Sequence, residues 1–402
     1  MAKTISPSEP PFSVGVRIPP WTTFARGVYP GLMAYIQQHS PWRIETSENT
    51  TQEIPPVTID EHWQGDGLIV FRCTRQEYHA WKRRGIRVVH ISSEAPPGLR
   101  SPIASVGMDN DTVGRLAAEH LLGRGLSRFA CWSDPTRRYS RERIDGFRSR
   151  LQETGYDAQV IAKSISKIPM AQRWKSIEEK LCRFLPDLEP PLGFFAKDDI
   201  SAISVIRACQ LIGLRVPEDV AVIGCNNDPA FVYTSTPSLT SVAYPAYEIG
   251  WNAAALLNQM LSRPDWTPDE RTLLPVTQVV ERQSTMVYGY EDPLVSQVWL
   301  FLKQNPQRHA VSVREVATHL AIAEPTLRRR FREATGRSVK SAIDETRLRR
   351  VQQLLQTSET PIKHIAFQCG FQASEDLSRF FRRQTGHTPT QWRAKAREGS
   401  RW

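Results

Sequence analysis

Short apolar segments alternate with segments of helical spacing through most of this chain. "GLIVF" at 67–71 indicates a buried strand, the residues up to Gly85 have the spacing of an amphipathic helix, and "IRVVHIS" at 86–92 indicates another strand. Neighbouring parallel strands need a crossover connection, which is usually a helix. The alternation therefore predicts parallel sheets covered by helices, which is an α/β fold.

The alternation runs from Phe12 to residue 283 and predicts two α/β lobes in one sensor domain. We expect the lobes to divide near Asn110 and the chain to cross back within 236–245. The carboxyl ends of the strands in open α/β folds are where ligands bind. Residues 1–11 are expected to form a flexible N-terminus.

Beyond a linker at 284–293, residues 294–397 show only helical spacing, and 398–402 are interpreted as a tail. The predicted fold class is thus a two-lobed α/β sensor domain, similar to periplasmic binding proteins, followed by an all-α domain.

The all-α region contains a duplicated element. "TLRRRFREATG" at 326–336 and "DLSRFFRRQTG" at 376–386 lie fifty positions apart. Each follows a shorter apolar helix and a tight turn, which is the helix-turn-helix pattern whose second helix enters the major groove of DNA. The residues between the copies read as one long helix. Because B-DNA repeats about every 10 base pairs, two such motifs predict binding to double-stranded DNA at an operator with two half-sites.

The charge of the chain supports a nucleic-acid partner. Residues 294–402 hold 20 Lys and Arg against 9 Asp and Glu, whereas the preceding residues hold 32 against 33. A basic domain beside a neutral one indicates a polyanion partner for the basic domain only. A merely solvated basic face is the alternative reading of this charge.

The last hundred residues resemble the AraC/XylS-type DNA-binding domain. The residues that carry this resemblance are Gly370, Phe371, Ser374, Phe381, Arg382, Gly386, Thr388, Pro389, Trp392 and Arg393. The resemblance implies that base edges are read by Glu324, Pro325, Arg328 and Arg329 in the first copy, and by Ser374, Glu375 and Arg379 in the second. Arg332, Arg382 and Arg383 lie later on their helices and are predicted to contact phosphates.

The preceding domain is similar to the effector domain of LacI/GalR-type regulators. The similarity is carried by "VPEDVAVIGCNND" at 216–228, with support from "GMDNDTVGRLAAEHLLGRG" at 107–125 and "SVAYPAYEIGWNAAALL" at 241–257. It implies a small-molecule sugar effector and ligand contacts at Arg26, Arg141, Asp198, Asn226 and Tyr244.

The order of the two domains resembles that of regulators of pentose operons. This implies xylose or a similar pentose as the effector, a homodimer, contact with RNA polymerase and activation of sugar-utilisation genes.

Other classes of function find little support in the sequence. No CxxC pair and no Cys/His cluster with metal-ligand spacing is present, so we expect no metal site, no cofactor and reduced cysteines. No apolar run approaches the ~20 residues that a membrane span requires, and no secretory leader is visible, so we expect a cytoplasmic protein with no membrane partner.

Two alternatives stay open. Asp198 and Asp199 could serve acid/base catalysis, but no GxSxG, Walker, GxGxxG or HExxH motif accompanies them, and we expect no enzyme. The α/β domain could also be only a dimerisation scaffold, or sense a ligand that is not a sugar.

Overall fold

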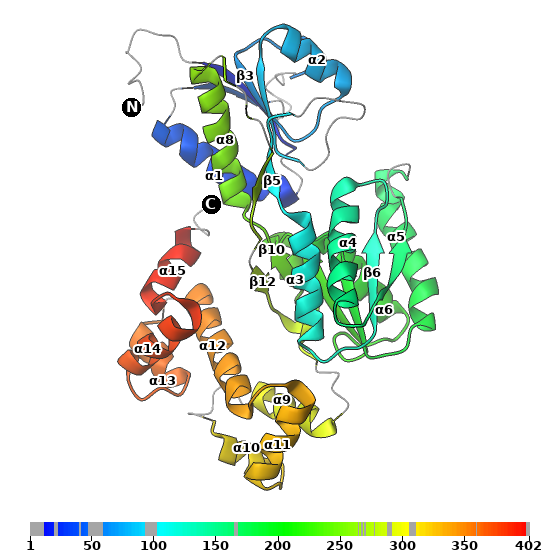
Figure 1. The fold of residues 1–402 in the computed structure, drawn as a ribbon, viewed down its shortest axis with the longest axis vertical. Coiled ribbons are helices and arrows are strands. Elements are labelled where there is room, and N and C mark those ends of the chain that lie inside the picture. Colours follow the sequence, from blue (N-terminus) through cyan, green and yellow to red (C-terminus); the bar gives the residue numbers. More distant parts are fainter. Residues whose placement is uncertain are drawn as a thin grey trace. The chain divides into compact units, whose positions relative to one another are not determined.

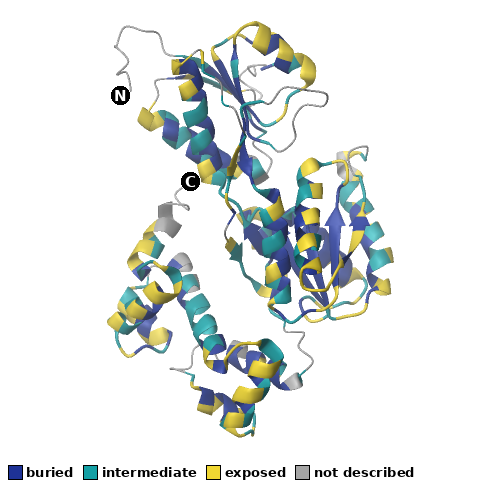
Figure 2. Cartoon of the chain, viewed as in Figure 1, coloured by how far each residue is buried: buried dark blue, intermediate teal, exposed yellow. Residues whose placement is uncertain are grey.

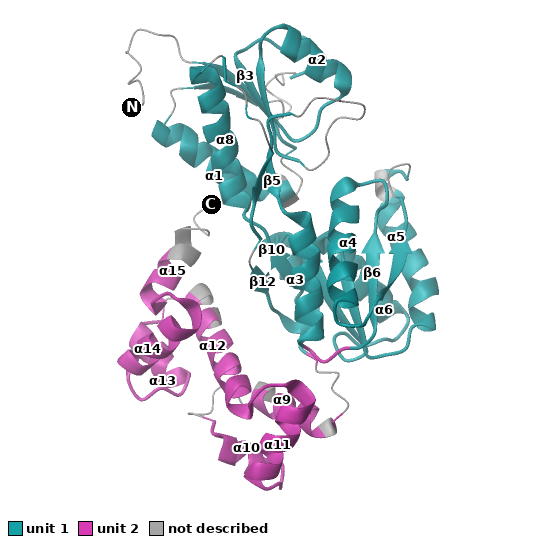
Figure 3. Cartoon of the chain, viewed as in Figure 1, with its two compact units in different colours: residues 1–123, 127–286 teal, residues 124–126, 287–402 magenta. Residues whose placement is uncertain are grey.

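The structure is a computed structural model of the chain. It describes residues 12–19, 23–39, 42–46, 59–92, 103–164, 168–263, 265–266, 268, 271–276, 278–287, 292–304, 311–358 and 360–398. The N-terminus at 1–11 and most of the tail fall outside these ranges. The chain divides into two compact units (Figure 3), one made of 1–123 with 127–286 and the other of 124–126 with 287–402.

The amino-terminal lobe of the first unit is a four-stranded parallel sheet with the order β2-β1-β3-β4. Its strands are β1 (Ser13–Arg17), β2 (Arg43–Thr46), β3 (Gly67–Val70) and β4 (Arg87–His90), and its helices are α1 (Thr23–His39), α2 (Arg75–Arg83) and α8 (Ala246–Ser262). The α2 helix packs over a cluster that contains Trp63, Leu68 and Trp81. The α8 helix comes from much later in the chain and lies against α1 and the sheet (Figure 1).

The carboxyl-terminal lobe is a six-stranded sheet with the order β12-β10-β9-β8-β6-β7, parallel except for β12. Its strands are β6 (Phe129–Ser133), β7 (Ala158–Ala162), β8 (Leu192–Ala196), β9 (Val220–Cys225), β10 (Thr240–Ala243) and β12 (Gln278–Val280). Its helices are α3 (Asn110–Leu122), α4 (Arg138–Gln152), α5 (Met170–Phe184), α6 (Asp199–Leu211) and α7 (Pro229–Val232), with 3-10 turns η1 (Leu185–Asp187) and η2 (Gln283–Thr285). The central strands are buried on both faces (Figure 2).

The chain passes between the lobes at three places. It leaves β5 (Val106–Met108) for α3, it leaves β10 for α8 at Tyr244, and it leaves β11 (Thr272–Leu274) for β12. The β5 and β11 strands pair in parallel, which ties two of these passages together. The passage through β11 was not predicted from the sequence.

Glycines allow two helix pairs of this unit to pack closely. A Cβ atom at Gly114 of α3 would lie 1.9 Å from the Arg143 carbonyl oxygen of α4, and one at Gly250 of α8 would lie 2.0 Å from the Val28 carbonyl oxygen of α1. No side chain fits at such distances. The contact at Gly114 holds the start of α4, and therefore Arg143, against the start of α3.

The second unit is entirely helical in its described part. Its helices are α9 (Pro293–Gln304), α10 (Val313–His319), α11 (Glu324–Thr335), α12 (Val339–Thr357), α13 (Ile362–Gln368), α14 (Ser374–Thr385) and α15 (Pro389–Glu398). Two separate apolar cores pack on α12: Val339 and Ile343 belong to the first core, and Val351 and Leu355 to the second. At 19 residues, α12 is about 28 Å long. It therefore holds two helix-turn-helix subdomains on one rigid element.

Candidate DNA interface and effector site

The duplicated element forms two helix-turn-helix motifs, α10 with α11 and α13 with α14. The inward residues Leu327 and Phe331 of α11 are completely buried, as are Leu377 and Phe381 of α14. These residues lie four apart, on one face of each helix. The arginines between and beside them therefore project away from the core.

The turns and caps of the two copies also correspond. The turn residues Ala321 and Gly370 both have left-handed backbones, with φ of 51° and 76°. Gly336 and Gly386 end α11 and α14 in the same left-handed conformation. Because L-residues other than glycine rarely adopt this conformation, Ala321 is strained where Gly370 is not.

Each predicted base-reading arginine is paired with a carboxylate of its own helix. Arg328 Nε lies 2.9 Å from Glu324 Oε1, and Arg379 Nη2 lies 2.7 Å from Asp376 Oδ1. Arg329 Nη1 lies 2.7 Å from Glu333 Oε2, a partner that the sequence analysis did not identify. The three guanidinium groups are exposed, so such pairs hold them only weakly. A DNA phosphate or guanine edge can displace these carboxylates.

The remaining predicted DNA contacts also lie on exposed surface, except for Ser374, which is half-buried. Arg332, Arg382 and Arg383 are exposed, and no carboxylate pairs with them in the part of the chain that is described. Pro325 is exposed in the first turn of α11. Ser374 Oγ donates to Glu375 Oε1 across 3.2 Å at the start of α14. All ten predicted DNA contacts thus lie on α11 and α14.

In the first unit, Phe24, Arg26, Asp228 and Tyr244 meet where the two lobes come together, and we call this group the inter-lobe cluster. Arg26 of α1 forms an ion pair with Asp228, which follows β9. The Phe24 ring stacks on the Tyr244 ring, with centroids 5.5 Å apart and planes 5° apart. Tyr244 also donates its hydroxyl to the Phe24 carbonyl oxygen across 3.3 Å. Two of the five predicted ligand contacts, Arg26 and Tyr244, therefore bridge the lobes.

Asp198 is the N-cap residue of α6, and both of its carboxylate oxygens contact neighbouring groups. Its Oδ1 accepts from the Ser201 amide at 2.8 Å, and its Oδ2 pairs with Lys197. Burial acts to raise the pKa of Asp198, but the charge of Lys197 and these hydrogen bonds outweigh it and lower the pKa. The buried Lys197 amine also contacts the Tyr139 hydroxyl at 3.2 Å.

The adjacent Asp199 points the other way and is completely buried. It accepts hydrogen bonds from Ser241 Oγ at 2.6 Å and from the Asp228 amide at 3.0 Å. Burial raises the pKa of Asp199 to about 7. Asp199 therefore connects Ser241 of β10 with Asp228, which is the residue that pairs with Arg26.

Asn226 lies at the end of β9 in a strained conformation, with φ of 118°. The backbone N–H of Asn226 donates to the Val242 carbonyl oxygen at 3.0 Å, and this bond joins the ends of β9 and β10. The next residue, Asn227, accepts from Arg282 Nη2 at 2.8 Å. Backbone strain of this kind gathers at ligand sites.

Arg141 is the one predicted ligand contact that the structure places away from the other four. Arg141 is exposed and donates to the Pro135 carbonyl oxygen at 2.6 Å, so it does not join the inter-lobe cluster. Arg143 is the buried arginine instead, only 3% exposed. Two positions on a helix differ by about 200°, so the two side chains leave opposite faces. Ser140, Arg143, Ile144 and Phe147 are spaced as one inward face, which was visible in the sequence.

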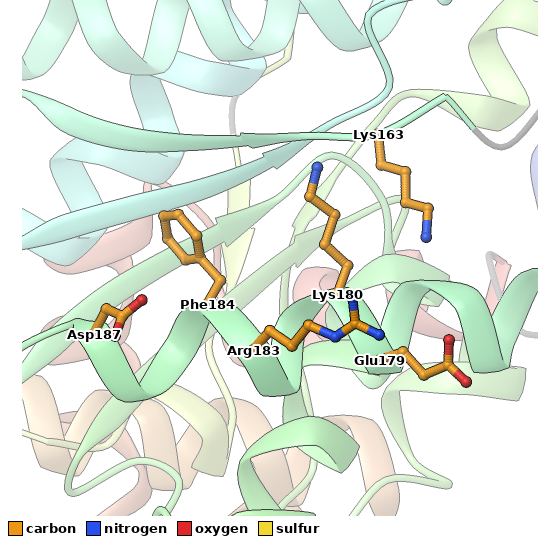
Figure 4. Close-up of a pocket in the computed structure, with 6 residues that line it drawn as sticks. All are labelled: Lys163, Glu179, Lys180, Arg183, Phe184 and Asp187. Carbon is orange, nitrogen blue, oxygen red and sulfur yellow. The ribbon is translucent and has the colours of Figure 1, made fainter.

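A cavity of about 330 Å³ lies elsewhere, beside α5 and η1 of the carboxyl-terminal lobe (Figure 4). It is lined by Lys163, Glu179, Lys180, Arg183, Phe184 and Asp187. Lys163 and Lys180 donate to the main-chain carbonyls of Ser176 and Ala162. None of the predicted ligand contacts lines this cavity.

Residues 118–285 match the periplasmic binding protein-like domain family, and residues 316–395 match a helix-turn-helix domain family. The chain is 27% identical to the xylose operon regulatory protein of Escherichia coli strain K12 over 92% of its own length and 94% of that protein. The chain is a DNA-binding transcription regulator. It is 29% identical to the xylose operon regulatory protein of Haemophilus influenzae, over 72% of this chain and 74% of that one.

This regulator also matches a solved structure described as xylose-binding transcription activator xylR, at 25% identity. The TM-score is 0.60, and the match covers 95% of this chain and 98% of the other. The regulator thus combines a periplasmic binding protein-like domain with an AraC-type helix-turn-helix domain, as predicted, and the predicted fold class is confirmed. Its relatives are transcription regulators and not enzymes, which agrees with the prediction.

Within the described residues, no helix is both long and apolar enough to cross a membrane. The described part likewise contains no group of three His, Cys, Asp or Glu side chains placed to hold a metal ion.

Proposed function

We propose that this regulator binds a specific operator through α11 and α14 and responds to a small sugar bound between the lobes of its α/β domain. The observation that carries the DNA-binding half is the repeated motif, in which two buried faces and two capping glycines place Arg329 and Arg379 at equivalent exposed positions. Each helix then reads one half-site through bidentate contacts from arginine to guanine edges.

The inter-lobe cluster supports the sensing half of the proposal. It gathers charged groups and the aromatic rings of Phe24 and Tyr244 where the two lobes meet. Sugars are bound by this combination, since charged and amide groups hold the hydroxyls and a ring covers the apolar face. Of the predicted contacts, Arg26, Asp198, Asn226 and Tyr244 stay in the proposal, and Arg143 replaces Arg141.

The relatives suggest the finer details. The curated relatives are named as xylose operon regulators and the solved one as a xylose-binding activator. A xylose-like pentose is therefore the first effector to test, with activation of sugar-utilisation genes as the outcome. The proposal includes a cytoplasmic homodimer that occupies two half-sites and contacts RNA polymerase. Ligand shifts its conformational equilibrium only through different affinities for the two states.

Thermal unfolding against a panel of pentoses and hexoses tests the sensing half. A ligand at ~100 times its dissociation constant adds ~2.7 kcal/mol to the stability of the domain that binds it. Arg26→Ala should abolish that shift. Selection of bound fragments from random DNA tests the other half, because recovery of one two-part sequence is expected.

The α/β domain as a dimerisation scaffold without a ligand is the competing function. Under that function no sugar shifts the unfolding transition, and Arg26→Ala changes only stability. DNA selection would still succeed.

A further inference from the structure

Arg330 of α11 differs from the neighbouring arginines of the first copy, because it lies beside the buried face of the helix. Its position is about 60° round the helix from Leu327, which is buried in the first core of the helical unit. Arg330 is half-buried, whereas Arg328 and Arg329 are exposed. Its guanidinium contacts the helical unit itself.

The partner of Arg330 is Asp292, which lies just before α9. Arg330 Nε donates to Asp292 Oδ2 at 2.9 Å and Arg330 Nη2 donates to Asp292 Oδ1 at 2.5 Å. This two-bond geometry distinguishes an ion pair that fixes two groups from a loose surface pair. Asp292 Oδ1 also accepts from the Leu294 amide at 2.9 Å. One carboxylate therefore caps the start of α9 and holds α11.

Apolar contacts join the same two helices. The α9 helix lies beside α11 (Figure 1), and both contribute to the first core. In that core, the ring centroids of Trp299 and Phe331 lie 6.2 Å apart. The main stretch of the helical unit begins at Val287, so Asp292 comes shortly after the junction with the α/β domain. The start of the helical unit is thus fixed to its first reading helix.

The second copy has no equivalent of this pair. The residue fifty positions after Arg330 is Phe380, at the same offset that separates the capping glycines Gly336 and Gly386. Phe380 is only 7% exposed, and its ring centroid lies 5.2 Å from that of Phe371. An apolar side chain therefore suffices for packing at this position. Of the two copies, the one beside the junction has the arginine.

We propose that Asp292 and Arg330 are positioning residues that hold α11 at the angle its base contacts require, so that the junction between the domains acts on the half-site of α11. This rests on the proposed reading of two half-sites by α11 and α14. The α14 helix packs in the second core, around the other end of α12. Base reading depends on the angle of the helix, because two hydrogen bonds to one guanine edge both need the correct distance and direction.

Fluorescence anisotropy of the full chain tests this with the selected operator and with two forms in which one half-site is scrambled. Arg329→Ala and Arg379→Ala identify the half-site of each helix, because each should lose the penalty for scrambling its own half-site. Asp292→Asn removes the charge but keeps an oxygen that can cap α9, since asparagine is a good N-cap residue. We expect Asp292→Asn to reduce the penalty at the α11 half-site about three- to tenfold and to leave the α14 penalty unchanged.

Further variants separate the ion pair from other roles of its members. Arg330→Gln should have the same effect as Asp292→Asn, and the double variant should lose no more than either single variant. Asp344→Asn is the matched control, because Asp344 is 17% exposed and pairs with Lys340 at 2.6 Å on α12. It should change neither penalty. Arg330→Lys keeps the charge and should retain part of the α11 penalty even where Arg330→Gln does not fold.

Three outcomes overturn the inference. Equal losses at both half-sites would show a general effect on the folding of the helical domain. A loss in Arg330→Gln without one in Asp292→Asn would make Arg330 itself a DNA contact, and unchanged penalties in both variants would exclude a positioning role. If scrambling either half-site leaves the affinity of the unchanged protein intact, the proposed reading of two half-sites fails as well.

Discussion

Arg26 of the amino-terminal lobe forms an ion pair with Asp228 of the carboxyl-terminal lobe, and the two residues are 202 positions apart. Asp228 is nearly buried, with 5% of its side chain exposed, whereas 43% of Arg26 is exposed. The pair holds the lobes in contact without any ligand. An effector that enters between the lobes has to replace this contact or complete it.

Arg26→Ala should destabilise the α/β domain, because it leaves the buried Asp228 carboxylate without its cation. We expect a loss of about 1–2 kcal/mol in the free energy of unfolding, reduced by the exposure of Arg26. Urea denaturation measures it. Arg43→Ala is the control, since Arg43 is 75% exposed and 3.6 Å from Glu45. Equal losses in the two variants would show that the inter-lobe pair contributes nothing special.

Arg329→Ala and Arg379→Ala should weaken binding to the specific operator much more than binding to unrelated DNA. Each loses a bidentate base contact, which is worth ~1–3 kcal/mol or roughly 5- to 150-fold in affinity. Fluorescence anisotropy with both DNAs at one salt concentration measures the two affinities. Arg75→Ala on α2 of the other unit is the control and should change neither. A uniform loss on both DNAs would assign these arginines to phosphate contact.

Arg332, Arg382 and Arg383 should govern the dependence of DNA affinity on salt. Each phosphate contact releases counterions, so each change to Gln should reduce the slope of log affinity against log salt by about 0.9. Anisotropy titrations at several potassium chloride concentrations give the slope. A slope that stays constant in a variant would exclude a phosphate contact for that residue.

The free energy of unfolding of the Asp199→Asn protein should increase relative to that of the unchanged protein as pH rises. The pKa of Asp199 is raised to about 7 in the fold from an ordinary value of 3.8. Between these values the folded state keeps a proton that the unfolded chain has lost, so the stability contributed by Asp199 falls as pH rises. The slope is on the order of 1.4 kcal/mol per pH unit. Above about pH 7 no further change is expected.

Urea denaturation from pH 4 to 8 measures this difference. Asp219→Asn is the control and should show almost no variation over this range, because hydrogen bonds and charge from Arg215 lower the pKa of Asp219 below its ordinary value of 3.8. Its contribution is present above the ordinary pKa and is lost as pH falls. A difference between the Asp199→Asn and unchanged proteins that does not vary with pH would show that Asp199 stays in one protonation state.

Ala321→Gly and Gly370→Ala should change the stability of the helical domain in opposite directions. Ala321 has φ of 51° and Gly370 has φ of 76° at the same position of the two turns. Glycine relieves the strain at Ala321 and should add roughly 0.5–1 kcal/mol, whereas alanine at Gly370 should cost about 1 kcal/mol. Thermal unfolding detects both. Stability changes of the same sign would contradict equivalent turns.

Much of the proposed DNA interface was predictable from the sequence. The inward face of each second helix depends on residues four apart, such as Leu327 and Phe331, and the capping glycines depend on single letters. Such local patterns act within one or two turns of helix, so the sequence shows them directly. The pairing of Arg329 with Glu333 is equally local and was detectable at the i,i+4 spacing.

The proposed effector site was less predictable, because its residues come from segments far apart in the chain. Polar residues at strand ends led to Asp198 and Asn226, which follow β8 and β9 in the structure. Of the two arginines that lie two positions apart on α4, Arg141 was chosen, whereas the buried one is Arg143. Which of these two arginines is buried depends on the face that α4 turns towards α3 and the end of β8. The contact at Gly114 sets that face.

Short-range periodicity and composition were enough to predict the α/β architecture, the two helix-turn-helix motifs and the location of the basic charge. The folded structure was needed to show that Arg26 meets Asp228, that Asp199 is buried beside Ser241, and that Arg143 is the buried arginine of α4. Burial and ion pairing depend on contacts between segments separated by tens to hundreds of residues, and no local pattern encodes these distances.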